Sequence, residues 1–246
     1  MKSKAFHAFE QKLSYFDDDI ELIDVLKIAV SRGDLTDPTS QYVMKYIDSS
    51  KHSHIVRRKN SDVSREQIIN HLRSSIYSSY VKDVYEEVTH YLRTMLKKAA
   101  ENGFDSARII GDHPFNVEAK KILELGNWTN VCQMVSDSLF QSLEKEKSTL
   151  NLLKKTAKKL ALNVDEQLIN DALPYLEVRH FLVHSDGKLS QEYIKKYPSI
   201  QHDKDGCVIL SYTFICNMRS LVKSLICKFD EEVIAKNFLK ESDTQP

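Results

Sequence analysis

The sequence predicts an all-α protein, a multi-helix bundle of long helices. Apolar residues recur at the three- and four-residue spacing of an α-helix along most of the chain. Six glycines and five prolines in 246 residues are too few for a turn-rich β architecture. The hydrophobic fraction of 41% is that of an ordinary globular protein with a packed core. The one place where the residues allow β structure is a very short strand or hairpin near residues 206–210.

The N-terminal region is expected to form three helices, each with apolar residues at helical spacing: residues 5–16, residues 19–31, and a short helix over residues 37–47. The short helix is predicted because Asp37 is a good N-cap and Pro38 suits the first helical position. The polar residues that follow, 48–63, are interpreted as a loop. Residues 1–62 would therefore be an N-terminal helical extension, to which the sequence assigns no role.

The rest of the chain is expected to form a second helical domain, residues 63–238. A capping box at Ser64 and Gln67 would start its longest helix, which Asn102 and Gly103 would end. Further helices are expected over residues 116–125, 128–159 with a kink near Ser148, 165–184 with an interruption at Pro174, 190–194 and 211–237. The tail, residues 239–246, is expected to be disordered.

Composition narrows the class of protein. No apolar run approaches the length needed to span a bilayer, and the first residues lack the features of a signal peptide, so no membrane partner is expected. The four cysteines are not paired as CxxC, which indicates buried free thiols in a reducing cytoplasm and no zinc site. The net charge is zero, so any contact with RNA must come from a local basic patch. The best such patch is Arg57, Arg58 and Lys59.

Three arginine–histidine pairs at a spacing of five or six residues stand out as candidate chemistry: Arg65 with His71, Arg108 with His113, and Arg179 with His184. Arginine can bind phosphate through a fixed fork of donors, and histidine can move a proton near neutral pH. Context separates the three pairs. Only Arg179 and His184 have an apolar helical segment before them and a glycine stop, Gly187, behind them. They are therefore the predicted catalytic residues.

The segment around this pair resembles the signature of the HEPN superfamily, all-helical domains common among prokaryotic ribonuclease toxins and antiviral proteins. The matching residues are Arg179, the polar His180, the apolar Phe181, Leu182 and Val183, then His184, Gly187 and Tyr193. The resemblance implies a metal-independent endoribonuclease without a cofactor. In that reaction the ribose 2′-hydroxyl attacks the adjacent phosphorus and leaves a 2′,3′-cyclic phosphate.

The resemblance also implies roles for the motif residues. His184 would be the general base or acid, and Arg179 would neutralise the charge on the phosphorane. His180 would orient the phosphate or a partner histidine, or else be structural. Asp186 would accept a hydrogen bond from an imidazole, or else be a turn residue at the end of the helix. In some HEPN toxins a tyrosine that is modified by a partner enzyme stands at the position of Asp186, so that form of control is not expected here.

Assembly and the competing functions follow from the same motif. A separation of five residues turns a helix about 140° beyond a full turn, so Arg179 and His184 do not share a face unless the helix unwinds near His184. A homodimer with the motif at its interface would complete the site, as in HEPN nucleases.

An antitoxin or a partner from a defence operon fits the same resemblance. The alternatives are a non-catalytic HEPN-like module that binds RNA or protein, and a helical adaptor in a defence system.

Overall fold

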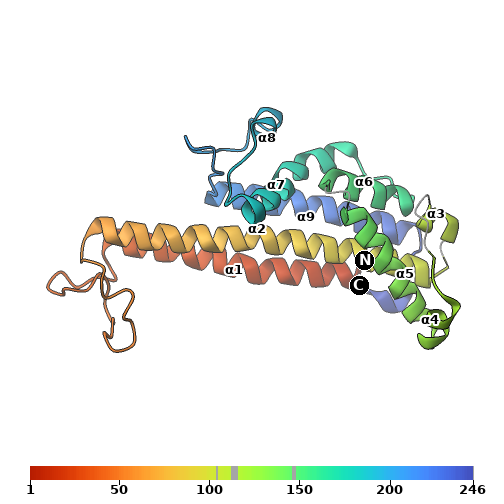
Figure 1. The fold of residues 1–246 in the computed structure, drawn as a ribbon, viewed down its shortest axis with the longest axis horizontal. Coiled ribbons are helices and arrows are strands. Elements are labelled where there is room, and N and C mark those ends of the chain that lie inside the picture. Colours follow the sequence, from red (N-terminus) through yellow and green to blue (C-terminus); the bar gives the residue numbers. More distant parts are fainter. Residues whose placement is uncertain (104, 112–115, 146–147, 246) are drawn as a thin grey trace. The chain divides into compact units, whose positions relative to one another are not determined.

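A computed structural model describes residues 1–103, 105–111, 116–145 and 148–245, and it confirms the all-α fold (Figure 1). Its helices are α1 Lys4–Arg32, α2 Asp62–Glu101, α3 Ser106–Ile110, α4 Ala119–Glu124, α5 Trp128–Lys145, α6 Thr149–Lys159, α7 Glu166–His184, α8 Gln191–Lys196 and α9 Tyr212–Ala235. Two short strands, β1 Lys2–Ser3 and β2 Thr244–Gln245, form an antiparallel pair. Near residues 206–210 the described chain makes only isolated bridges, from Lys188 to Cys207 and from His202 to Val208.

The chain divides into two compact units. The first contains Met1–Leu13, Val81–Ile209 and Cys216–Pro246, and the second contains Ser14–Tyr80 and Leu210–Ile215. This division does not follow the boundary expected at residues 62 and 63. The first turns of α1 belong with the larger unit, because Phe6 and Phe9 are 1% and 2% exposed in its core.

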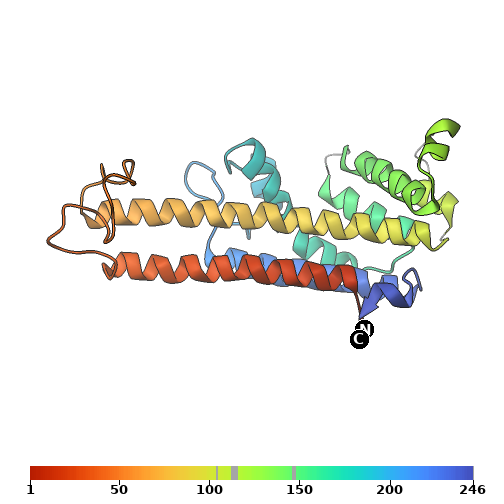
Figure 2. The same cartoon turned by 90° about the horizontal axis from the view of Figure 1, so that it is seen from below.

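The smaller unit is built on a helical hairpin, in which residues 14–32 of α1 run antiparallel to residues 62–80 of α2 (Figure 2). Ser31 donates a hydrogen bond to Glu66 at one end, and Tyr80 Oη donates to Asp17 Oδ1 at 3.1 Å at the other. The sequence placed two helices over residues 5–31, but α1 is continuous from Lys4 to Arg32. Leu72 of α2 is 43% exposed, so not every apolar residue of this helix faces the hairpin.

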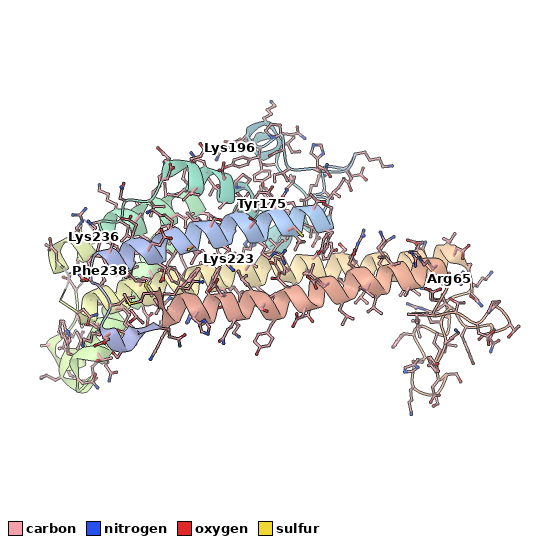
Figure 3. All side chains as sticks on the ribbon, turned by 180° about the vertical axis from the view of Figure 1, so that it is seen from behind. Arg65, Tyr175, Lys196, Lys223, Lys236 and Phe238 are labelled. Carbon is pink, nitrogen blue, oxygen red and sulfur yellow. The ribbon has the colours of Figure 1, made fainter. Side chains whose placement is uncertain are left out.

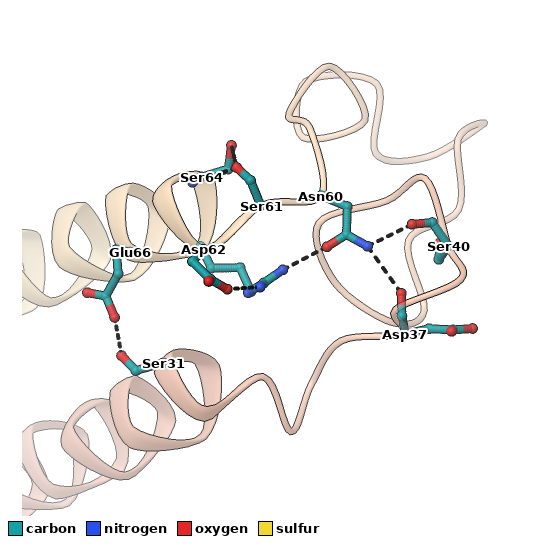
Figure 4. Close-up of polar contacts among 9 residues, drawn as sticks. Ser31, Asp37, Ser40, Asn60, Ser61, Asp62, Ser64 and Glu66 are labelled. Carbon is teal, nitrogen blue, oxygen red and sulfur yellow. Dashed lines mark hydrogen bonds and ion pairs between the residues drawn. The ribbon is translucent and has the colours of Figure 1, made fainter.

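The segment between α1 and α2 contains turns and not the short helix expected over residues 37–47. The reason is local: Asp37 Oδ1 accepts hydrogen bonds from the Thr39 amide at 2.9 Å and the Thr39 hydroxyl at 2.7 Å, which forms a turn in place of a helical cap. The Asn60 side chain donates to the Ser40 carbonyl at 2.7 Å and to the Asp37 carbonyl at 3.1 Å (Figure 4). Asn60 therefore ties the two ends of this segment together.

The start of α2 also differs from the expected capping box at Ser64 and Gln67. The helix begins at Asp62, and Ser61 Oγ accepts a hydrogen bond from the Ser64 amide at 3.3 Å (Figure 4). Ser61 therefore satisfies one of the free amides of the first turn, three residues earlier in the chain than expected.

The larger unit has a core drawn from nearly every helix that contributes to it. Its fully buried side chains include Tyr91, Leu92, Leu96, Phe140, Leu153, Val178, Met218, Leu225 and Phe229. Aromatic residues at helical spacing usually lie in a core, and Tyr91 is 1% exposed, but Trp128 at the start of α5 is 64% exposed. Helical spacing marks which side chains can share a face, and it does not show whether another element covers that face.

Residues 128–159 form two helices, α5 and α6, and not the single kinked helix that was expected. Ser148 Oγ accepts a hydrogen bond from the Asn151 amide at 3.2 Å and so caps α6. Residues 146–147, between the two helices, lie outside the described residues. The helix expected over residues 116–125 is shorter than predicted and is α4, Ala119–Glu124.

The C-terminal residues are ordered up to Gln245, whereas the sequence predicted a disordered tail over residues 239–246. After a 3₁₀ turn at Glu241–Asp243, β2 pairs with β1 through Lys2 with Gln245 and Ser3 with Thr244. The Asp243 carboxylate lies 3.0 Å from Lys98 Nζ. The polar composition of the tail predicted disorder. Strand pairing, however, uses backbone groups, which every residue except proline supplies in full, so a polar segment can still be ordered.

Candidate nuclease groove

The helix that carries the predicted motif, α7, is held in place at its start by Asp165. The Asp165 carboxylate accepts a hydrogen bond from the Gln167 amide at 2.9 Å, so Asp165 caps the helix. Pro174 lies inside α7 but does not divide it, because the helix is continuous from Glu166 to His184. Proline lacks the amide that would donate to the carbonyl of Asn170. Leu173, Pro174 and Leu176 are buried, so the apolar face of α7 offsets this loss.

The end of α7 is set by a glycine stop. The amides of Ser185 and Gly187 both donate to the Phe181 carbonyl at 2.9 Å. Asp186 and Gly187 have φ angles of 49° and 83°, in the left-handed region that glycine adopts without a steric penalty. Val208 N donates to the Gly187 carbonyl at 2.9 Å and anchors the turn. The helix therefore does not unwind at His184, and His184 is its last residue.

A groove of about 550 Å³ runs along the C-terminal half of α7, and it contains all three of the motif's nitrogen-bearing side chains. Arg179, His180 and His184 line it from α7. Other helices and their flanking residues contribute Tyr85, Glu144, Ser148, Thr149, Leu152, Ser190, Glu192, Tyr193 and Lys196. The structure thus brings together the residues that the motif predicted, and it adds a second cation, Lys196, from α8.

Within the groove, the two histidines are close neighbours and the arginine lies to one side. His180 and His184 are one helical turn apart, and their ring centroids are 4.8 Å apart. The Arg179 guanidinium carbon lies 5.0 Å from the centre of the Tyr85 ring, a cation–π arrangement that holds the side chain. Arg179 and His184 both line the groove although α7 stays helical through His184, so unwinding near His184 is not needed to bring the two side chains to one hollow.

The floor of the groove is fixed by Tyr193 of α8. Its hydroxyl donates to the Pro174 carbonyl at 2.6 Å, and its ring lies 4.9 Å from that of Phe181. Burial raises the pKa of the Tyr193 hydroxyl. Ser190 caps α8 as predicted, through its side chain and the Tyr193 amide at 3.1 Å. In this way α8 is positioned against α7, and Lys196 comes to the groove (Figure 3).

A carboxylate that the motif analysis did not select, Glu177, also lines the groove. Burial raises its pKa, while the charge of Lys196 acts in the opposite direction. Lys196 Nζ lies 4.0 Å from the Glu177 carboxylate. Glu177 is three residues before His180 and seven before His184, so helical spacing alone could have found it. Tyr85 comes from α2, far away in sequence, and no local pattern could have found it.

Because the pKa of Glu177 is raised, the folded protein keeps this proton to a higher pH than the unfolded chain does. At pH values between the ordinary pKa of glutamate and the raised value, the folded state binds more protons than the unfolded chain does. The free energy of unfolding therefore falls as the pH rises through this range. We therefore expect Glu177→Gln to gain stability relative to the wild type between about pH 4 and pH 7. Urea unfolding of both proteins across this range measures the difference.

A matched control for this prediction is Glu192→Gln, which removes an exposed carboxylate from the same groove. Its stability relative to the wild type should change little, because substitutions of exposed side chains usually have small effects on the free energy of unfolding. If Glu177→Gln instead became less stable than the wild type as the pH rose, the ion pair with Lys196 would outweigh the burial of the carboxylate.

The other predicted site residues lie outside the groove. Asp186 is exposed in the turn after α7, and within the described chain no hydrogen bond joins its carboxylate to an imidazole. Arg57, Arg58 and Lys59 are exposed in the other compact unit, where Arg58 donates to Gln67 Oε1 at 3.2 Å.

The two rejected arginine–histidine pairs do not resemble the groove. Arg65 forms an ion pair with Asp62 and donates to Asn60 Oδ1 at 2.7 Å, whereas His71 is exposed. Arg108 Nε donates to the Lys158 carbonyl at 3.1 Å. His113 lies outside the described residues.

Metal-binding clusters, disulfides and membrane-spanning helices are absent from the described residues. In the described parts of the chain, no group of three or more His, Cys, Asp or Glu side chains is placed to hold a metal ion. The four cysteines are free, and of these only Cys132 is buried, whereas all four were expected to be. Over the same described ranges, no helix has the length and apolar character to cross a membrane.

No family model, curated protein or solved structure matches the chain.

Proposed function

We propose that the protein is a metal-independent endoribonuclease that acts in the cytoplasm as a toxin or antiviral effector. The observation that carries the proposal is the groove, in which Arg179, His180 and His184 line one hollow, with two imidazole rings 4.8 Å apart. Two imidazoles and a guanidinium are the groups that cleavage of RNA by its own 2′-hydroxyl needs. The resemblance to the HEPN signature points to the same reaction.

In the proposed reaction, one imidazole removes the proton of the ribose 2′-hydroxyl as its oxygen attacks the adjacent phosphorus. The bond from phosphorus to the 5′-oxygen breaks, and that oxygen receives a proton from an imidazolium. The products are a 2′,3′-cyclic phosphate and a free 5′-hydroxyl. Arg179 stabilises the charge on the phosphorane, and Lys196 adds a second cation close to the phosphate path. His184, exposed at the last position of α7, is the imidazole assigned to general acid–base catalysis.

The chemistry of the product ends tests this mechanism. The pure protein, incubated with RNA, should give fragments that end in cyclic, 2′- or 3′-phosphates, and excess EDTA should not slow the reaction. The ends can be identified by mass spectrometry, with an EDTA-treated sample as the matched reaction. A free 3′-hydroxyl, or complete inhibition by EDTA, would point to water activated by a metal and would refute the proposed mechanism.

The proposal includes a homodimer in which residues 175–193 of two copies face each other. It is supported by the exposure of His180 and His184 in the groove and of Val183 on the same helix, where a second copy could add its own imidazoles. Light scattering at micromolar concentration should report a dimer, and a mixture of inactive Arg179→Ala and His184→Ala subunits should regain part of the cleavage activity. An active monomer would contradict the shared site.

One observation favours a second function, a non-catalytic module that binds RNA or protein. The groove also contains three carboxylates, Glu144, Glu177 and Glu192, and the chain as a whole has no net charge. Carboxylates oppose the approach of a polyanion. Binding of RNA without cleavage would favour this alternative. Binding of a protein would favour it too, and an antitoxin or a defence-operon partner is the protein to test.

A further inference from the structure

The outward face of α1 in the smaller unit is apolar over residues 15–28. Tyr15, Leu22, Val25 and Ile28 are 69%, 58%, 62% and 45% exposed. With about 100° of rotation per residue, the first three lie within about 80° of one another, and Ile28 lies about 60° beyond Val25 on the same side. Single exposed apolar residues need no explanation, but four on one helix face within four turns form a patch. We call these four residues the α1 face.

The α1 face is separate from the apolar face that packs in the core. Ile20, Ile23 and Val30 are 3%, 1% and 2% exposed and lie on the opposite side of the same helix. A helix that is apolar on both sides is usually buried on both sides. The smaller unit is a hairpin of two helices with one short added segment, so a further helix against the α1 face would complete a bundle of the usual kind.

Acidic side chains accompany the α1 face. Residues 14–32 carry five acidic side chains and only two basic ones. Asp18, Asp19 and Glu21 are exposed beside or within the apolar stripe, and among the described residues none of them forms an ion pair or a hydrogen bond through its side chain. The surface therefore combines an apolar stripe with uncompensated negative charge.

This combination excludes several occupants. RNA and anionic membranes are repelled by carboxylates. A second copy of the chain fits poorly, because the acidic block at residues 17–24 lies near the middle of the segment. A two-fold axis that placed the α1 face against itself would bring the two acidic blocks together. A helix with an apolar stripe and basic flanks satisfies both the apolar and the charged parts of the surface.

We propose that the α1 face binds an amphipathic helix of another protein, with apolar residues on one side and Lys or Arg residues along its flanks. The recognition is of the kind in which a helix lays its apolar side against a complementary surface. Tyr15, Leu22, Val25 and Ile28 supply the apolar contact, and Asp18, Asp19 and Glu21 set the preference for basic flanks. This surface lies in the unit that does not contain the groove, and its function does not depend on RNA cleavage.

The test uses two fluorescent synthetic peptides, each of about 18 residues. Both have the same leucine stripe, but one has lysine flanks and the other has glutamate flanks. Fluorescence anisotropy with the full-length protein should show at least about tenfold tighter binding of the lysine peptide. The triple variant Asp18→Lys/Asp19→Lys/Glu21→Lys should reverse this preference. The variant Leu22→Ser/Val25→Ser should weaken binding of the lysine peptide by about tenfold or more.

Controls make each outcome decisive. Ile122→Ser/Leu123→Ser removes two exposed apolar residues from the other unit and should leave peptide binding unchanged. Melting temperatures should show that every variant folds, as expected for exposed positions. Equal binding of the two peptides, or a preference that survives the charge reversal, would overturn the proposal. Light scattering that showed a wild-type dimer dissociated by Leu22→Asp would also overturn it, because a second copy would then occupy the α1 face.

Discussion

Replacing His184 with alanine should lower the rate of RNA cleavage by about 10²- to 10⁴-fold, the usual contribution of one acid–base group. Arg179→Ala should lower it by about 10²- to 10³-fold, because the charge of the phosphorane would lose a fixed cation. Both side chains face the groove and neither supports the core, so the melting temperature and the helical content should change little. Cleavage of a labelled RNA, measured beside thermal unfolding, checks both parts.

The matched control for this pair is His71→Ala, which removes an exposed histidine from α2 in the other unit and should keep full activity. His113→Ala, at a residue outside the described ranges, should also remain active. If His71 or His113 proved essential and His184 did not, the assignment of the catalytic residues would be wrong. A stable but fully active His184→Ala protein would leave the groove without its acid–base group and would favour the non-catalytic function.

Replacing Asp230 with alanine should lower the free energy of unfolding by about 3 kcal/mol or more. Asp230 lies on α9 and is 2% exposed. Its carboxylate accepts hydrogen bonds from the Ser3 amide at 2.9 Å, from the Ser3 hydroxyl, and from the Tyr91 hydroxyl at 3.0 Å. Alanine would leave these three buried donors without an acceptor. Urea unfolding, monitored by circular dichroism, measures the loss.

Two further variants distinguish the effect of losing the buried carboxylate from a general effect of mutating α9. Asp230→Asn keeps one acceptor oxygen and should lose less stability than Asp230→Ala. Glu231→Ala removes the neighbouring exposed carboxylate and should stay within about 0.5 kcal/mol of the wild type. A loss below about 1 kcal/mol for Asp230→Ala would show that the Ser3 and Tyr91 donors find other partners or water.

Burial of the Tyr91 ring, together with the adjacent Asp230, raises the pKa of the Tyr91 hydroxyl well above its ordinary value. Tyr91 therefore stays protonated and continues to donate to Asp230 across the range in which tyrosines normally ionise. This contact joins α2, α9 and the N-terminal residues in the core of the larger unit.

Features that depend on neighbouring residues in the chain could be predicted from the sequence. The long helices follow from apolar spacing, and the caps at Asp165 and Ser190 follow from one side chain and an amide two or three residues away. The stop at Gly187 is equally local, because a left-handed φ angle favours glycine. Glu177 could have been predicted by the same reasoning, since it lies seven residues before His184 and so on the same face of the helix.

Features that depend on distant residues could not be predicted in this way. The Tyr85 ring near Arg179 comes from α2, far from the motif in sequence. Lys196 is close in sequence, on α8, but it lines the groove only because α8 packs against α7. Trp128 has the spacing of a core residue, yet it is 64% exposed in the structure. The turn at Asp37 shows a different limit, because aspartate before proline suits both a helix cap and a turn, and the choice depends on contacts such as that with Asn60.

The hydrogen bond from Tyr193 to Pro174 joins residues 19 positions apart, and it bears on how the groove fluctuates. It closes a segment that contains the second half of α7, the Gly187 turn and the first turn of α8. Proline at position 174 already interrupts the ladder of backbone hydrogen bonds on the upstream side. The closed segment therefore has the boundaries of a single cooperative opening unit. Arg179, His184 and Tyr193 all lie within it, so we expect these three groove residues to become ordered or disordered together.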